Sequence, residues 1–550
     1  CPMTPMIDKG LAASALGAME LELARSMKGL RLKGHPSTCY LSYLLRVRQG
    51  YSVWGRYGSV FYSTPLDSST LHADLRVGSY RSDQTVDGRL EESEEDPDWH
   101  EWLEGPEELD PFTLRYCFWR LTEARHREAL KDYYDKKKIS LDERLLHEAP
   151  SLRRVPATRV VNPIARARRT RAQAEDFVRR TSALFLKRPR IDDPYVQLKE
   201  IVQTRLIVNS ENTRSVAQER FVEVLVHGSM LAPDGVRQNS TRTFYARRWS
   251  EIPDEAEMGD AIEALHEDLL ELVASEPMDP YAGPALFGGT AAGVLFHEAI
   301  GHRLEGERLL SRSEGHTFAR KIGKRILPKG IDLVDDPSLA RFGGRSLYGH
   351  YAIDDEGTPS QPVRLVEDGV LRRFLTSRNG IPGQSGSNGH GRSAKGHEVM
   401  ARMGNLIVSS RAPLGQDQLI ERWMEEVARE EQPFGLLVTN AQSGETTTSS
   451  DAYEFQAFQI DPTQVYLVDV DSGKRRRVRD VSFVGTPLAA IQGVLALGDD
   501  PVVDNSYCGA ESGSVPVGTI APSVLLREIE VQRSTRARHH PSILRFPPRR

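Results

Sequence analysis

The 550-residue chain has few cysteines, no long apolar run and no large excess of either charge. Its four cysteines are too few and too scattered for a disulfide framework. No apolar run approaches the ~18 residues of a membrane-spanning helix, so no transmembrane segment is predicted. The 72 basic and 77 acidic side chains leave a net charge of −5, which gives no general attraction to nucleic acid. With 39% hydrophobic residues, a chain of this length can form two or three packed domains.

The four cysteines lie in different sequence contexts. Cys39 falls in a predicted strand and Cys117 in a predicted helix, where a free cysteine is usually a small buried hydrophobe. Cys508 lies in a turn-rich segment and is the candidate metal ligand of the four. Cys1 stands where a mature bacterial lipoprotein carries its lipid, so we expect a lipid-anchored protein of the cell envelope. A cytoplasmic protein, in which Cys1 marks an arbitrary boundary, is the alternative.

Residues 1–275 alternate between helical and strand-like patterns. The spacing of apolar residues predicts helices over 11–27, 111–138, 165–180 and 261–274. Strands are predicted in a meander over 38–77 and over 197–209, 220–231 and 237–247. We therefore expect an α+β fold in which the N-terminal domain, 1–275, is an antiparallel sheet covered by helices. The acidic, tryptophan-containing segment 91–108 is predicted to be a solvated loop.

Three prolines, Pro277, Pro280 and Pro284, mark the boundary to a second domain over 276–530. This domain is predicted to be rich in strands and to carry the functional helix described below. Its predicted elements are a hairpin over 363–373, a helix over 414–429, and strands within 435–470 and 514–530. The segment 376–404 is rich in Gly, Ser and Asn and is predicted to be a functional loop. Residues 531–550 are predicted to be a basic mobile tail.

Two polar segments of the second domain differ from known ligand loops. The acidic segment 353–357 lacks the alternating ligand spacing of an EF-hand, so we expect a turn that packs near the functional site. The glycine-rich segment 380–396 has neither the lysine of a P-loop nor a helix after G-x-G-x-x-G, so nucleotide binding is not expected. Its backbone could instead receive an extended substrate as an added strand.

The stretch 288–307 contains the residues most suited to catalysis. It reads His297-Glu298-Ala-Ile-Gly301-His302, which is H-E-x-x-x-H and one residue longer than the H-E-x-x-H of zincins. Two neutral imidazoles and an adjacent carboxylate are what a hydrolytic zinc site uses, because the imidazoles bind the ion and the carboxylate deprotonates water.

The extra residue between the histidines has a geometric consequence. Residues five apart in a regular helix are separated by roughly 140°, so His297 and His302 would face different sides. Both can bind one ion only if the turn widens, as in a π-bulge, and Gly301 is best able to absorb that distortion. The alternative is an amphipathic core helix that carries two surface histidines.

The motif resembles the zinc helix of the TldD/PmbA family of bacterial metallopeptidases, on the TldD side. Further segments resemble the same family in the same order, at 353–357, 386–392, 402–405 and 507–518. Four ordered landmarks are more specific than one short motif. The resemblance covers residues 195–530.

The resemblance implies one zinc ion per chain, bound by His297, His302 and Cys508. Glu298 is then the general base, which takes a proton from zinc-bound water during attack on a peptide carbonyl. A peptidase of this kind accepts unfolded or modified peptides. It works as a homodimer or as a heterodimer with a PmbA-like subunit.

Other polar residues are candidates for supporting roles. His390 and Arg402 are candidate donors to the oxyanion, and with Asn405 they are the candidate substrate-binding residues. One of Glu305 and Glu307 can be an outer partner of a ligand imidazole, and the alternative is that both are solvated.

Two other functions remain open for the same residues. One is a zinc-dependent hydrolase of a non-peptide amide, and the other is a non-catalytic partner subunit of a TldD/PmbA-type complex. Retention of both histidines, Glu298 and Cys508 argues against the non-catalytic subunit. The charge balance does not favour a nucleic-acid partner.

Overall fold

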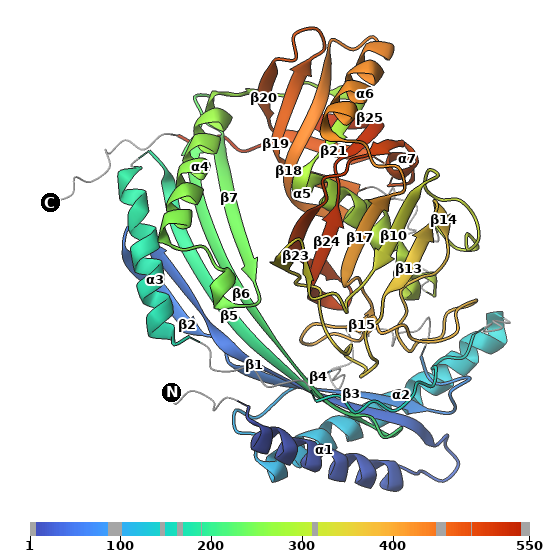
Figure 1. The fold of residues 1–550 in the computed structure, drawn as a ribbon. Coiled ribbons are helices and arrows are strands. Elements are labelled where there is room, and N and C mark those ends of the chain that lie inside the picture. The colour runs from blue at the N-terminus through green and yellow to red at the C-terminus, as the bar shows by residue number, and fades with distance from the viewer. Residues whose placement is uncertain are drawn as a thin grey trace.

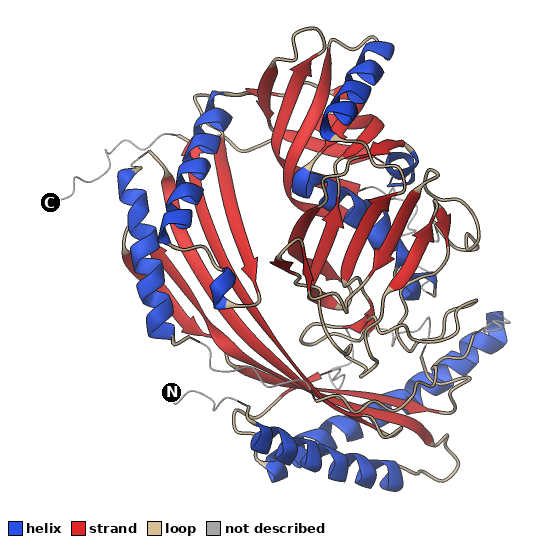
Figure 2. Cartoon of the chain, in the orientation of Figure 1, coloured by secondary structure: helices blue, strands red, loops and turns tan. Residues whose placement is uncertain are grey.

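The computed structural model describes residues 7–85, 102–143, 149–161, 169–188, 190–310, 317–446, 458–485 and 487–540. A long curved sheet carries helices on its outer face, and a second body with two further sheets lies against its concave side (Figure 1). Helices and strands are mixed in this way throughout, which confirms the α+β class (Figure 2). Cys1 and residues 91–101 of the predicted acidic loop lie outside the described residues. Within those residues, no helix is long and apolar enough to cross a membrane.

The first sheet is antiparallel throughout, with strand order β4-β3-β1-β5-β6-β7 and β2 beside β1. Its strands are β1 (Thr38–Arg56), β2 (Ser59–Pro65), β3 (Ser68–Val77), β4 (Trp102–Glu104), β5 (Asp192–Asn209), β6 (Arg214–Leu231) and β7 (Arg237–Ala246). The first half of β1 pairs with β3 and the second half with β2. Gly50 lies between these halves, where a Cβ atom would be 2.0 Å from the carbonyl oxygen of Glu200. This close approach requires glycine.

Four helices cover the outer face of this sheet (Figure 1). They are α1 (Lys9–Gly29), α2 (Pro111–Glu143), α3 (Arg171–Ala183) and α4 (Glu255–Ala274). Two of these helices begin at a different residue from the one predicted, because of their N-caps. Helix α3 begins later and α4 begins earlier. Thr170 caps α3, so the described helix does not include the predicted residues 169–170, and residues 162–168 lie outside the described residues. Asp254 and Glu257 form a capping box, so α4 begins six residues before the predicted position 261.

The second body contains a six-stranded and an eight-stranded sheet among the described residues. The strand order of the six-stranded sheet is β14-β13-β10-β17-β24-β23. The strand order of the eight-stranded sheet is β18-β9-β25-β21-β19-β20-β8, and β22 pairs with β25. The strands of the first are β10 (Ile331–Asp335), β13 (Val363–Glu367), β14 (Val370–Leu371), β17 (Asn405–Ser410), β23 (Val502–Ala510) and β24 (Gly513–Ala521). Those of the second are β8 (Glu276–Pro277), β9 (Tyr281–Phe287), β18 (Phe434–Thr446), β19 (Phe458–Asp469), β20 (Arg475–Arg479), β21 (Val481–Gly485), β22 (Val494–Leu497) and β25 (Val524–Arg533).

The helices of the second body are short, and the functional stretch lies between its two sheets. They are α5 (Gly289–Phe296), α6 (Gln416–Arg429) and α7 (Pro487–Gln492). Two pairs of two-residue strands also belong to this body: β11 (Arg341–Phe342) pairs with β12 (Arg345–Ser346), and β15 (Gly391–Arg392) pairs with β16 (Met400–Ala401). Apolar side chains of α5 and of both sheets form one continuous buried core. Because α5 is held from both sides, the residues that follow it have little freedom to move.

The strands of the first sheet and those of the second body occupy separate parts of the chain. Every described strand of the first sheet precedes residue 247, and every strand of the other two sheets follows residue 275. The predicted mobile tail is wrong for its first part, because β25 continues to Arg533. The chain then returns to the first sheet, where the backbone N–H of His539 donates to the carbonyl oxygen of Gly235 at 2.6 Å. Residues 541–550 lie outside the described residues.

The acidic segment 353–357 is a turn, as predicted, but it packs against the first sheet and does not line the metal cavity described below. Asp354 accepts hydrogen bonds from the backbone N–H groups of Glu356 at 3.0 Å and Thr358 at 2.8 Å. Asp355 reaches the first sheet, where it contacts Arg205 Nη1 at 2.6 Å and Arg46 Nη2 at 3.2 Å. Burial alone would raise the pKa of Asp355, but the two guanidinium groups hold it well below its usual value. The turn therefore joins the two bodies through a buried ionic cluster.

This cluster leads to a prediction about stability. The variant Asp355→Ala leaves Arg46 and Arg205 buried without one of their carboxylates, so the free energy of unfolding should fall by about 3–5 kcal/mol. Urea denaturation measures this loss. The control is Glu367→Ala, because the pairs of Glu367 with Arg364 and Arg372 lie at the surface and should contribute about 1 kcal/mol or less. Equal losses in the two variants would show that the buried cluster does not stabilise the junction.

Candidate metal centre

The two histidines of the motif are brought together by a π-helical turn. Helix α5 ends at Phe296, and the next five residues form η3 (His297–Gly301), a π-helix. The backbone N–H of His302 donates to the carbonyl oxygen of His297, which is the five-residue hydrogen bond of a π-turn. A Cβ atom at Gly301 would be 2.3 Å from Met403 Sδ, so glycine also permits close packing here. The structure thus contains the widened turn that the spacing of the histidines predicts.

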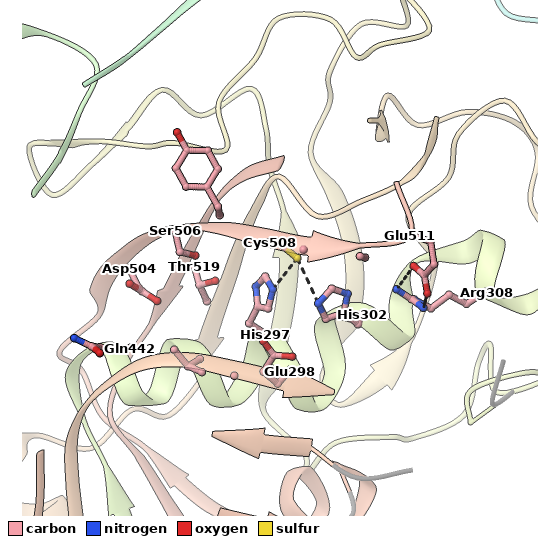
Figure 3. Close-up of a pocket in the computed structure, with 15 residues that line it drawn as sticks. His297, Glu298, His302, Arg308, Gln442, Asp504, Ser506, Cys508, Glu511 and Thr519 are labelled. Atoms are coloured by element: carbon pink, nitrogen blue, oxygen red, sulfur yellow. Dashed lines mark hydrogen bonds and ion pairs between the residues drawn. The ribbon is translucent and has the colours of Figure 1, made fainter. Parts of the chain in front are cut away.

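His297, His302 and Cys508 meet in the cavity beside this turn (Figure 3). The sulfur of Cys508 lies 3.1 Å from His297 Nε2 and 3.4 Å from His302 Nε2, and one ligand atom from each residue lies within 4.8 Å of the others. The two imidazole rings are nearly perpendicular, at 89°. All three residues are buried. Two imidazole nitrogens and a thiolate are a donor set that suits zinc, so these residues fit a metal ion.

The charge of the cysteine is set by its surroundings. Burial raises the pKa of the Cys508 thiol, but His302, His297 and Arg402 together outweigh burial and bring that pKa well below the usual value. Arg402 Nη2 lies 3.1 Å from the sulfur and also donates to the backbone oxygen of Cys508 at 2.7 Å. These contacts favour the thiolate, which is the form of cysteine that binds metals.

Glu305 is the outer partner of His302. Its Oε2 atom lies 3.0 Å from His302 Nδ1 and accepts from Arg308 Nε at 3.1 Å, while Oε1 lies 3.3 Å from Arg402 Nε. Burial would raise the pKa of Glu305, but His302 and the two arginines hold it far below its usual value. A carboxylate on Nδ1 orients the ring so that Nε2 faces the metal position. Glu307 instead accepts from the backbone N–H of Ala401 at 3.0 Å.

Glu298 lies in the same cavity as the three candidate ligands (Figure 3). Burial raises the pKa of Glu298, although His297 and His302 oppose this effect. The side chain packs against Gly444 on β18, where a Cβ atom would be 2.3 Å from Glu298 Cγ. The carboxylate thus has room because residue 444 has no side chain.

The cavity has a volume of about 210 Å³ and runs along β23. Figure 3 shows Asp504 and Gln442 on one side of the histidines and the pair of Arg308 and Glu511 on the other. Burial raises the pKa of Asp504 to about 7. The residues that line the cavity are Val294, His297, Glu298, His302, Arg308, Gln442, Gly444, Asp504, Ser506, Tyr507, Cys508, Gly509, Ala510, Glu511 and Thr519.

The three predicted substrate-binding residues do not line this cavity. His390 is fully buried and its ring bridges Asp335, at 3.1 Å, and Asn388. Asn405 donates to the backbone oxygens of Asp336 and Leu339 at 3.0 and 3.1 Å. Buried polar groups that already have partners in the protein are not available to substrate, so their positions do not support substrate contact.

Arg402 differs from the predicted role in another way. It is fully buried, and its guanidinium group contacts Cys508, Glu305 and the Ser512 hydroxyl, the last at 2.7 Å. It therefore positions a candidate ligand, and the predicted donation to an oxyanion is not supported. Sequence reasoning also missed Asp504, although the two-residue period of a strand places Asp504, Ser506 and Cys508 on one face of β23.

Comparison with known proteins identifies the second body. Residues 281–533 match the family described as the PmbA/TldA metallopeptidase C-terminal domain. These residues form a PmbA/TldD C-terminal domain. They include His297, Glu298, His302 and Cys508, so the candidate centre lies entirely within the matched domain.

Relatives of the PmbA/TldD domain carry metalloprotease names. A metalloprotease of Archaeoglobus fulgidus is 26% identical over 60% of this chain and 73% of its own length. A metalloprotease TldD homolog of Haemophilus influenzae is 29% identical over 45% of this chain, and the match spans about half of that relative, 48%. Names of this kind imply a metal in the relatives. The activity and substrates of the whole chain are therefore considered below as proposals.

The likeness extends to the whole fold. The crystal structure of TldE from Thermococcus kodakarensis covers 94% of this chain and 100% of its own, with a TM-score of 0.60 and 13% sequence identity. At this identity the comparison establishes the fold alone. It shows that the curved N-terminal sheet and the PmbA/TldD domain occur together in another protein.

The geometry of the centre predicts how metal binding responds to substitution. The variant Cys508→Ser loses the thiolate, so zinc affinity should fall by more than the roughly 10–100-fold that loss of an outer partner costs. Competition with a chelating dye measures the affinity. The matched control is Cys117→Ser, because Cys117 is half-buried on α2 and packs in the core of the N-terminal domain. Wild-type affinity in Cys508→Ser would exclude the sulfur as a ligand.

Proposed function

We propose that the chain is a zinc-dependent peptidase. The observation that carries this proposal is the cavity in which His297, His302 and Cys508 approach one another beside Glu298. Two imidazoles, a thiolate and a nearby carboxylate are the groups that a hydrolytic zinc site requires. The metalloprotease names of the relatives support the same reading.

His297, His302 and Cys508 would hold the ion, one per chain. Zinc supplies Lewis acidity there, which lowers the pKa of water and polarises a carbonyl group. Three protein ligands leave a position for substrate or water, whereas structural zinc sites have four. The chain's own contribution is to fix the three ligand atoms in place. Glu305 does this for His302, and Arg402 does it for Cys508.

Glu298 would act as the general base. It accepts a proton from the attacking water and then delivers this proton to the nitrogen of the departing amine, so that the C–N bond breaks with a neutral amine as the leaving group. The buried environment that raises its pKa strengthens it as a proton acceptor. Gly444 is important for this role because it leaves space for the carboxylate.

Strand β23 gives a reason to expect peptides as substrates. Among the described residues β23 pairs only with β24 and lies at the end of the six-stranded sheet. An edge strand offers backbone N–H and C=O groups that an extended peptide can pair with, without regard to its sequence. An unfolded peptide presents its backbone in this way. As the family resemblance implies, the chain would act as a homodimer or with a PmbA-like subunit.

The test is the variant Glu298→Gln, which keeps the shape of the side chain and removes its basicity. We expect hydrolysis of an unstructured, quenched-fluorescent peptide to fall by about 10²–10⁴-fold, because a general base contributes that much to such reactions. Zinc content should stay at one ion per chain. The matched control is Glu276→Gln, an exposed glutamate at the end of β8, which should keep wild-type activity.

Metal removal completes this test. The chelated wild-type chain should lose cleavage and regain it with Zn²⁺. Wild-type activity in Glu298→Gln would reject the assigned base. Cleavage that persists without metal would reject the zinc mechanism. A wild-type chain that binds zinc but cleaves no peptide would favour the non-catalytic subunit.

A further inference from the structure

Three carboxylates line the cavity, and only one of them has neither a role in the mechanism above nor a partner in the protein. Glu298 is the proposed base. Glu511 forms a two-pronged ion pair with Arg308, at 2.7 and 2.9 Å. Asp504 remains, and its carboxylate forms no hydrogen bond or ion pair with any residue that the structure describes. Asp504 is half-buried, and withdrawing a carboxylate even partly from water without a partner is costly, so its position in the cavity favours a cation that binds there.

Asp504 lies on the same strand as one candidate ligand and beside the helix that leads to another. Asp504 lies on the same face of β23 as Cys508, four residues away, which is about 13 Å along a strand. Asp504 also packs against Gly293 on α5, where a Cβ atom would be 3.3 Å from Asp504 Cβ. Gly293 precedes His297 by four residues, about one helical turn or 6 Å. At about 3.3 Å per residue of an extended peptide, Asp504 therefore lies about two to four peptide residues from the candidate metal ligands.

The neighbours of Asp504 are suited to a small polar cation. Ser506 and Thr519 line the same end of the cavity, and Figure 3 shows their hydroxyl groups next to Asp504. Thr519 is the partner of Asp504 in the pairing of β23 with β24. Hydroxyl oxygens can accept hydrogen bonds from an ammonium group, which has three donors. The basic side chain that lines the cavity, Arg308, lies at the opposite end (Figure 3).

We propose that Asp504 is the specificity-determining residue of the cavity and binds a positively charged group of the substrate about two to four residues from the cleaved bond. This group is a lysine or arginine side chain or the free amino terminus of the peptide. The inference rests on the proposed peptidase function and adds the class of substrate. Asp504 makes a charge-assisted contact with the cation, while catalysis remains with Glu298 and the metal ligands.

The experiment uses the zinc-loaded full chain and a set of unstructured ten-residue peptides. One arm moves a lysine, norleucine or glutamate through the positions around the cleaved bond. The other compares free with acetylated amino termini. Mass spectrometry locates each cut, and kcat/KM is measured for wild type, Asp504→Asn and Asp499→Asn. Asp499 is the matched control because it is exposed and precedes β23, outside the cavity.

For wild type and Asp499→Asn we expect kcat/KM for lysine to exceed that for norleucine by roughly 10–100-fold at one position, as a charge-assisted contact would give. If the cation is instead the free amino terminus of the peptide, acetylation of that terminus should lower kcat/KM by the same factor. In Asp504→Asn the ratio should fall to near one. A KM effect larger than the kcat effect is expected if Asp504 acts in binding. Thermal melting confirms that the variant is folded.

Other outcomes would overturn the inference. They can be distinguished from a failure of the proposed function. If Asp504→Asn shows the same charge preference as wild type, the assignment of Asp504 is wrong while peptidase activity stands. If wild type cleaves no peptide, fluorescence anisotropy of the same labelled peptides still measures whether charge preference in binding depends on Asp504. Equal binding of lysine and glutamate peptides by wild type would reject the cation subsite. Tighter binding of glutamate peptides would also reject it.

Discussion

The candidate metal centre depends on a single π-helical turn between its two histidines. In a regular α-helix, His297 and His302 would be separated by roughly 140° around the axis and could not share an ion. The π-turn removes this separation, and the backbone bond from His302 to His297 shows where the extra residue is absorbed. Such a turn has poorer backbone hydrogen bonding than an α-helix and persists only where packing enforces it. Here Gly301 lies against Met403, and both neighbouring sheets bury the helix.

Charge compensation provides the second constraint. Glu305 is completely buried, and its burial is tolerated because His302, Arg308 and Arg402 all contact it. Arg402 contacts Cys508 as well, so one guanidinium group links a carboxylate behind one ligand to the sulfur of another. Candidate ligands that are more than 200 positions apart in the sequence are thereby aligned by the protein itself. A metal ion that binds such a site pays little for ordering its ligands.

Several features of this arrangement could be predicted from the sequence, and the reasons are local. The spacing of His297 and His302 predicts the π-turn if both bind one ion, and the period of apolar residues predicts the helices and strands. The starts of α3 and α4 were predicted at the wrong residues, although Thr170 with Gln173 and Asp254 with Glu257 form capping boxes that mark them. These signals require only neighbouring residues.

The roles of other polar residues could not be read in this way because their partners are distant in the sequence. His390 is satisfied by Asp335, and Asp355 by two arginines of the first sheet. Arg402 looked like a donor to substrate because nothing near it in the sequence shows Cys508. Strand register connects the remaining residues. Cys508 pairs with Val515 of β24, and a slip of one residue would turn it to the opposite face of the sheet. Asp504 would turn with it, so the same register fixes both the third candidate ligand and the residue proposed to select the substrate.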